Sequence, residues 1–185
     1  IAVASGAGGH AGQLSPFALV QEIREFFDGP LALSGSIANG GAVAAAQCMG
    51  ADLAYIGSAF IATDEAVAVD GYKDMIVDSK AGDIVYSNLF TGVHGNYLAP
   101  SIAQAGMDPN NLPESDPSAM NFGSGGNQKS KAWKDIWGCG QGIGAIKSRG
   151  PVSAYVDKLE REYKAAIAAL GRGEAVDFKA LTQGA

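Results

Sequence analysis

Three short apolar runs, each followed by a glycine-rich loop, organise the first sixty residues. The runs are residues 1–4, 30–33 and 52–56, and the loops that close them are residues 5–12, 34–37 and 57–60. Small residues at 40–50 fill the interval between the second and third runs, and we interpret that segment as a helix. Ser15 and Pro16 suit an N-cap and a first helical turn, with Leu19, Ile23 and Phe26 or Phe27 on one face of the helix that follows. The pattern predicts strands alternating with helices, as in a parallel sheet.

The pattern changes after residue 60. The pattern predicts a helix over 64–81, an extended segment over 83–90, a helical turn over 100–106 and a long polar loop over 107–131. Trp133 and Trp137 are four residues apart, which would place both on one helix face. Apolar positions in the 64–81 helix are Val67, Tyr72, Met75 and Ile76.

The clearest helix covers residues 151–170, where apolar residues recur at intervals of three and four. Its apolar stripe is Val152, Tyr155, Val156, Leu159, Tyr163, Ile167 and Leu170. Its predicted solvated face is Lys158, Glu160, Arg161, Glu162 and Lys164.

Composition narrows the class of protein. Hydrophobic residues make up 47% of the 185 residues, which is enough for a core, and the formal net charge is −6. A negative chain is a poor partner for nucleic acid or anionic membranes, and no apolar run approaches the roughly 18 residues of a membrane span. Two cysteines and two histidines show no metal-ligand spacing, so we expect no metal site. Cys48, in the small-residue helix, is expected to be a buried thiol in a reduced, cytoplasmic protein.

The second and third loops are candidates for phosphate binding. Glycine at the end of a strand lets backbone N–H groups approach an anion because no Cβ blocks them. Gly35 and Gly57 lie at such ends, with Ser34, Ser36 and Ser58 beside them. A (β/α)8 barrel commonly binds phosphate with the loops after its seventh and eighth strands. No GxGxxG opens a helix after a strand, so the pair indicates one phosphate rather than a pyrophosphate.

The first loop contains the candidate catalytic residue. Gly8 and Gly9 leave room for a flat ring close to the backbone, and His10 projects from among glycines at a strand end. His94 and Lys134 are weaker polar candidates, and His94 is expected to be a surface histidine.

These motifs together resemble one enzyme family. Residues 7–12 (AGGHAG) are similar to the AGGHxG motif of the nitronate monooxygenases, formerly 2-nitropropane dioxygenases. Residues 34–40 resemble that family's AGGIADG, and residues 55–60 its QMGTRF. The resemblance continues through 88–92 and 137–144, in the same order. Two departures are Gly6, where an acidic residue is common, and Ser36, where glycine is usual.

The resemblance implies an FMN-dependent barrel longer than this chain, since a (β/α)8 barrel needs about 200 residues or more. We therefore predict an α/β fold that is the C-terminal part of a (β/α)8 TIM barrel with a helical and loop extension. Residues 1–100 would hold about strands 6–8 and the segment after them, and residues 101–185 the long loop and C-terminal helical extension. The remaining N-terminal part of the same enzyme is an expected partner.

The implied function is FMN-dependent oxidation of alkyl nitronates with O2, with His10 as a base or a substrate-binding group. The loop residues named above would hold FMN, and Gln141 and Gly142 could reach the flavin. The alternatives are an NAD(P)H-dependent FMN reductase of quinones or enoyl thioesters, a class with a similar loop, and a non-catalytic fragment of a longer barrel enzyme. The sequence leaves a homo-oligomer possible and does not identify the physiological substrate.

Overall fold

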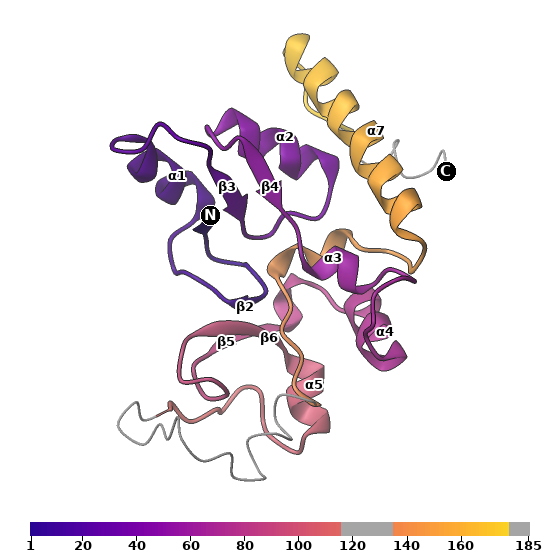
Figure 1. Ribbon diagram of the computed structural model, residues 1–185. Coiled ribbons are helices and arrows are strands. Elements are labelled where there is room, and N and C mark those ends of the chain that lie inside the picture. Colours follow the sequence, from indigo (N-terminus) through magenta and orange to yellow (C-terminus); the bar gives the residue numbers. More distant parts are fainter. Residues whose placement is uncertain (116–134, 178–185) are drawn as a thin grey trace.

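A small parallel sheet forms the first half of the fold. The computed structural model describes residues 1–115 and 135–177. Strands β1 (Ala2–Val3), β3 (Ala32–Ser34) and β4 (Leu53–Tyr55) pair in parallel in the order β1-β3-β4. Leu33 of the central strand lies opposite Ala2 and Ala54 and is almost completely buried. The three predicted strands are therefore confirmed, and the chain has an α/β fold (Figure 1).

Helices α1 (Pro16–Arg24) and α2 (Gly40–Cys48) connect these strands. Ser15 caps α1 by accepting the Ala18 N–H, and Asn39 caps α2 by accepting the Ala42 N–H, so each helix begins where a side chain replaces a missing backbone partner. Their small and aliphatic side chains form a cluster with the sheet, built on Ala2, Ala4, Val20, Leu31, Leu33, Ala46 and Ala51. The prediction that Phe26 or Phe27 shares a helix face with Leu19 and Ile23 is wrong, because both phenylalanines lie beyond the end of α1 and are exposed.

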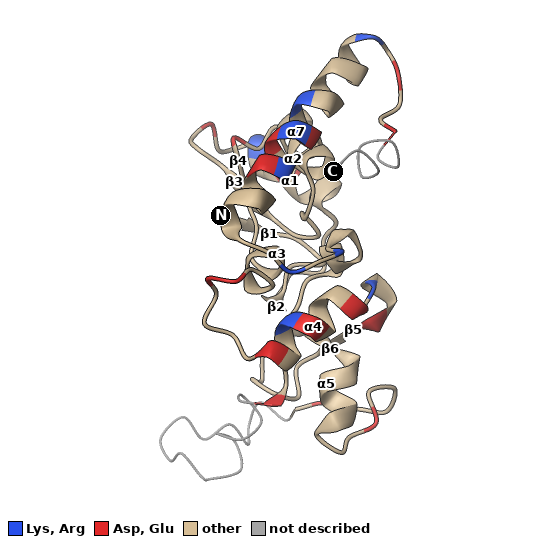
Figure 2. Ribbon diagram, turned by 90° about the vertical axis from the view of Figure 1, so that its right-hand side faces the viewer, with Lys and Arg blue, Asp and Glu red and all other residues tan. Residues whose placement is uncertain are grey.

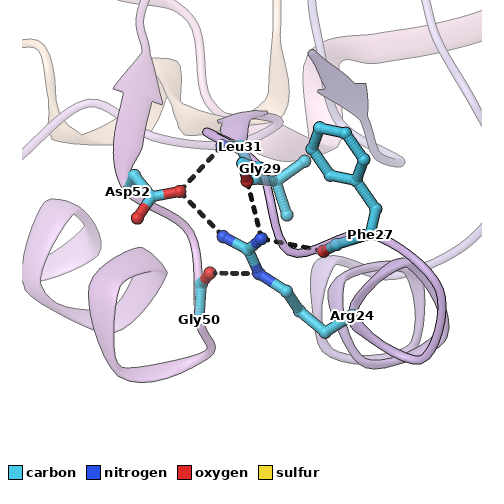
Figure 3. Close-up of polar contacts among 6 residues, drawn as sticks. All are labelled: Arg24, Phe27, Gly29, Leu31, Gly50 and Asp52. Atoms are coloured by element: carbon cyan, nitrogen blue, oxygen red, sulfur yellow. Dashed lines mark hydrogen bonds and ion pairs between the residues drawn. The ribbon is translucent and has the colours of Figure 1, made fainter.

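An arginine clamp closes the end of the sheet where β3 and β4 begin (Figure 3). The Arg24 guanidinium donates to the carbonyls of Phe27, Gly29 and Gly50 and pairs with Asp52 at 2.8 Å. Asp52 in turn accepts the Leu31 N–H at 2.8 Å. One side chain thus joins the two loops that enter β3 and β4, at the opposite end of the strands from the glycine loops.

A second sheet was not expected from the sequence. Strands β2 (Gly9–His10), β5 (Ile84–Ser87) and β6 (Gly95–Leu98) pair antiparallel in the order β2-β6-β5. All four residues of β6 are buried between its two partners. The segment that carries His10 is therefore a strand rather than a free loop, because β6 supplies its hydrogen-bonding partners.

Short helices lie between the two sheets along the chain and after the second one. They are α3 (Ser58–Ile61), α4 (Asp70–Asp78) and α5 (Ala99–Gln104), with 3-10 turns η1 (Ala81–Asp83) and η3 (Gln141–Ala145). The predicted 64–81 helix begins six residues late, and Val67 is fully exposed outside it. The buried ammonium of Lys73 donates to the carbonyls of Thr63 and Asp64, which holds the preceding segment in a non-helical path. Trp137 lies in an irregular segment instead of a helix, and Trp133 lies outside the described residues.

Helix α7 (Val152–Gly171) lies alongside α2, and its predicted position is confirmed (Figure 1). A Cβ on Gly40 would lie 2.2 Å from the Tyr163 nitrogen and 2.3 Å from the Leu159 oxygen, so the two helices touch backbone to backbone here. Glu162 does not belong to a solvated face: it is buried, accepts the Gly40 N–H at 2.9 Å and pairs with Lys158. A carboxylate at a helix N-terminus meets partly positive N–H groups, which explains its burial.

The burial predicted for Cys48 is also wrong. Cys48, predicted to be buried, is exposed, whereas Cys139 is completely buried. A helix made almost entirely of small residues has no distinct apolar face, so its sequence does not indicate which side faces the core. Cys139 belongs to the larger core cluster, with Ala38, Ala59, Ala62, Ile76, Leu98, Ile143 and Ile146.

Candidate functional site

A cavity of about 260 Å³ lies at the carboxyl ends of the parallel strands. The loops after β1, β3 and β4 meet there, together with Gly138, Gly140 and Gly142 from the second described range. In α/β sheets this end of the strands is the usual place for a ligand. Eight of the predicted site residues line the cavity: Gly8, Gly9, Ser34, Gly35, Ser36, Gly57, Ser58 and Gly142.

The loop after β3 has an unusual backbone. Gly35 has a φ of +140° and Ser36 a φ of +56°, a left-handed conformation that L-residues other than asparagine and aspartate seldom adopt. The Ser36 N–H donates to the Gly6 carbonyl at 3.2 Å. A Cβ on Gly6 would lie 2.1 Å from the Ser36 Oγ. A side chain at position 6 and the Ser36 hydroxyl would therefore occupy the same space. The two departures from the motif, glycine at position 6 and serine at position 36, are thus physically linked.

The loop after β4 presents its backbone to open space. A Cβ on Gly57 would meet no atom within 4 Å, so this peptide is accessible from the cavity. The Ser58 hydroxyl oxygen accepts the Gly140 N–H at 2.9 Å, and the same hydroxyl contacts the Cys139 sulfur. Burial raises the pKa of the neighbouring Cys139 thiol to about 11, although its contacts with Ser58 and Gly140 act in the other direction.

Glycines let the 138–142 segment close one wall of the cavity. A Cβ on Gly8 would lie 2.8 Å from the Gly140 nitrogen, and one on Gly140 would lie 2.7 Å from the Gly6 oxygen. The Gln141 N–H donates to that same Gly6 carbonyl at 2.9 Å. Gln141 itself is exposed and does not line the cavity, unlike its neighbour Gly142. The wall thus consists of backbone.

His10 lies beside the cavity without lining it. Its exposed ring places Nε2 at 3.1 Å from the Thr91 Oγ1. That hydroxyl donates to the Val93 carbonyl at 2.8 Å and accepts the Val93 N–H, so toward His10 it can act only as an acceptor. The network therefore assigns the proton of the neutral imidazole to Nε2 and leaves the lone pair on Nδ1.

Three residues that build this site were not predicted from the sequence: Tyr72, Asn96 and Thr91. Tyr72 lines the cavity, donates its hydroxyl to the Gly138 carbonyl and stacks on Trp137 with ring centroids 4.9 Å apart. Burial raises the pKa of Tyr72 above its ordinary value. Buried Asn96 donates to the Ala7 carbonyl at 2.7 Å and so holds the first loop, as Thr91 holds His10. A polar residue inside a buried strand was the available signal for Asn96, whereas Tyr72 matched an apolar helix position.

The two weaker candidates lie elsewhere. His94 stacks on Tyr86 with ring centroids 4.9 Å apart and does not line the cavity. Lys134 lies outside the described residues.

The cavity is electrically neutral on its walls. None of the described residues that line it is charged. Figure 2 shows Lys, Arg, Asp and Glu mainly on helices such as α4 and α7 and on connecting loops. An anion here would be held by backbone N–H dipoles and serine hydroxyls, the donors that suit a phosphate at glycine loops.

Two further properties concern the described ranges alone. Within residues 1–115 and 135–177, no group of three His, Cys, Asp or Glu side chains is arranged to hold a metal ion. No helix in these ranges combines the length and apolar character needed to cross a membrane.

Comparison with known proteins gives a consistent result. A family model described as Nitronate monooxygenase matches residues 1–162. A Nitronate monooxygenase of Paraburkholderia phytofirmans is 32% identical over 175 residues, which is 87% of this chain and 48% of that protein. A Probable nitronate monooxygenase of Staphylococcus saprophyticus is 35% identical over 103 residues, 50% of this chain and 29% of that protein. The chain thus spans about half, or less, of the curated relatives it matches.

Solved structures agree on the fold. A nitroalkane oxidase from Streptomyces ansochromogenes matches with a TM-score of 0.70 at 26% identity, covering 91% of this chain and 52% of that one. FabK from Thermotoga maritima matches with a TM-score of 0.71 at 24% identity, covering 92% of this chain and 55% of that one. The second likeness is one of fold alone.

Proposed function

This chain belongs to the nitronate monooxygenase family, and we propose that it carries the cofactor-binding part of an FMN-dependent enzyme that oxidises alkyl nitronates with O2. The observation that carries the proposal is the convergence of two glycine loops, after β3 and β4, on one uncharged cavity. A flavin would supply the redox chemistry, and the protein would supply position and hydrogen bonds.

The cavity suits a single phosphate monoester. The open peptide at Gly57 leaves its backbone accessible, since a Cβ there would meet no atom within 4 Å. In the loop after β3 the Ser36 N–H already bonds the Gly6 carbonyl, so we assign the backbone donor of that loop to Gly35. The hydroxyls of Ser34, Ser36 and Ser58 add donors. This donor set fits FMN, which has one phosphate. We assign Gly8, Gly9, Gln141 and Gly142 to the region of the flavin ring.

His10 has two roles compatible with its surroundings. The lone pair on Nδ1 can take the acidic α-proton of a neutral nitroalkane, because Nε2 is already bound to Thr91. A nitronate that is already ionised needs no base, and for it a protonated imidazole would serve as a hydrogen-bond donor. We propose that His10 acts on the substrate in one of these ways.

We also propose that the fold is the C-terminal part of a (β/α)8 barrel. The described residues contain no closed barrel: β1 and β4 each pair on one side only. Val3, Leu53 and Tyr55 on these edge strands are exposed. Because this chain covers 48% of the Paraburkholderia relative, further strands of the same enzyme are the natural partners for these edges. As part of this proposal, residues 1–100 belong to the barrel and residues 101–185 form the extension that contains α7.

Two measurements on the natural polypeptide test the function. Denaturation should release FMN, and release of FAD, or of no flavin from a folded protein, contradicts the cofactor assignment. Anaerobic mixing with an alkyl nitronate should bleach the flavin, and oxygen should restore its absorbance. Bleaching by NAD(P)H instead of nitronate would favour a reductase of quinones or enoyl thioesters. If neither compound bleaches the flavin, a non-catalytic role is favoured.

A further inference from the structure

Tyr155, the fourth residue of α7, contacts the chain at the ends of both glycine loops. Its hydroxyl donates to the Ala38 carbonyl at 3.1 Å. Its ring meets the Phe60 ring edge to face, with centroids 5.0 Å apart and planes at 89°. Ala38 comes directly after the loop that ends β3, and Phe60 lies in α3, which begins at Ser58 of the other loop. One side chain therefore contacts both halves of the proposed phosphate site.

A second contact from the same helix reinforces the first. Glu162, two turns further along α7, accepts the N–H of Gly40 at 2.9 Å. The chain from Ala38 to Gly40 is thus held at both ends by α7. Lys158 lies between the two residues, pairing with Glu162 at 2.9 Å and standing 5.9 Å from the centre of the Tyr155 ring.

Tyr155 acts from outside the cavity. It does not line the cavity, whereas Ala38 and Ser58 do. Its ring is packed into the core cluster that contains Ala38 and Ala59, and burial raises its pKa, so the hydroxyl stays protonated as a donor. Such a residue can influence a ligand only by setting where the loops stand.

We propose that Tyr155 is a positioning residue that fixes the spacing of the two glycine loops for the cofactor phosphate. This inference rests on the proposed function, because it requires that the loops bind a phosphate. Its prediction is specific: loss of the hydroxyl should weaken recognition of the phosphate more than recognition of the flavin ring. A residue that merely stabilises the fold would affect both equally.

The experiment uses the natural polypeptide, freed of flavin, and measures dissociation constants for FMN and for riboflavin, which lacks the phosphate. Tyr155→Phe removes only the hydroxyl, and Tyr155→Leu also removes the ring contact with Phe60. Tyr163→Phe is the matched control, because that hydroxyl lies on the same helix but bonds the Gln47 side chain of α2, away from the cavity. Melting temperature reports the stability of each variant.

We expect Tyr155→Phe to weaken FMN binding by about two- to tenfold, the range of one hydrogen bond, with a smaller change for riboflavin. Tyr155→Leu should lower the ratio of the two affinities further, and Tyr163→Phe should leave it unchanged. Equal losses for both ligands, or an unchanged ratio in a folded Tyr155→Phe protein, overturn the inference. If Tyr155→Leu does not fold, the Tyr155→Phe ratio alone decides. A wild-type protein without preference for FMN over riboflavin would refute the proposed phosphate site itself.

Discussion

The close approach of α2 and α7 makes Gly40→Ala a severe test of the structure. The new methyl carbon would lie 2.2 and 2.3 Å from backbone atoms of α7 and 2.6 Å from the Glu162 Cβ, so the helices must separate. Overpacking of this kind costs roughly 1–3 kcal/mol. Separation also breaks the buried bond between the Gly40 N–H and Glu162, for a further cost of about 1–3 kcal/mol.

The preference of helices for alanine over glycine offsets about 1 kcal/mol of this cost. We therefore expect a net loss of about 3 kcal/mol, and a fall in melting temperature of roughly 6–12 °C for a domain of this size. Thermal unfolding followed by circular dichroism measures it. Gly71→Ala is the matched control, since it also lies in the first turn of a helix but its Cβ would stand 3.5 Å from Trp137, an ordinary contact. If the two variants have the same melting temperature, α2 and α7 are not in backbone contact.

Four further outcomes follow from the described contacts. His10→Asn should slow oxidation of a neutral nitroalkane by about 10²–10⁴-fold and of preformed nitronate less, as steady-state kinetics with both forms would show. The Leu31 N–H, and then the guanidinium of its ion pair, hold the pKa of Asp52 below its ordinary value. Asp52 therefore adds stability above about pH 4 that is lost as pH falls through its folded pKa, and Asp52→Asn should flatten the acid side of a stability–pH curve. Thiol labelling below pH 9 should modify Cys48 in the folded protein and reach Cys139 only in denaturant, because burial raises the latter's pKa to about 11. Ser36→Gly should raise the unfolding free energy by about 1 kcal/mol in chemical denaturation, since glycine adopts the left-handed conformation without strain.

The elements that the sequence predicted are those with local signals. Glycine marks the ends of β3 and β4, Ser15 caps α1, and α7 has a long apolar stripe. Each signal lies within the element it specifies, so a single sequence is enough to read it. The glycine loops were predictable for the same reason, and the structure gathers most of the residues proposed there around one cavity.

The missed features depend on partners distant in the chain. Strand β2 has only two residues and exists because β6 pairs with it. Glu162 is buried because it meets the N-terminus of α2, and a helical pattern of α7 alone cannot reveal that neighbour. Tyr72 reaches the cavity through a hydroxyl, whereas its apolar ring dominated the sequence pattern.

The glycine contact between the first loop and the 138–142 segment also determines when the site can form. Gly8 packs against Gly140, so the ribosome must add more than a hundred residues after the first loop before that wall exists. At about 5–20 residues per second this interval is roughly 7–26 s, long enough for the βαβ cluster around Leu33 to collapse first. Closure of the cavity wall is therefore a late event for the nascent chain, separated in time from formation of the sheet that supports it.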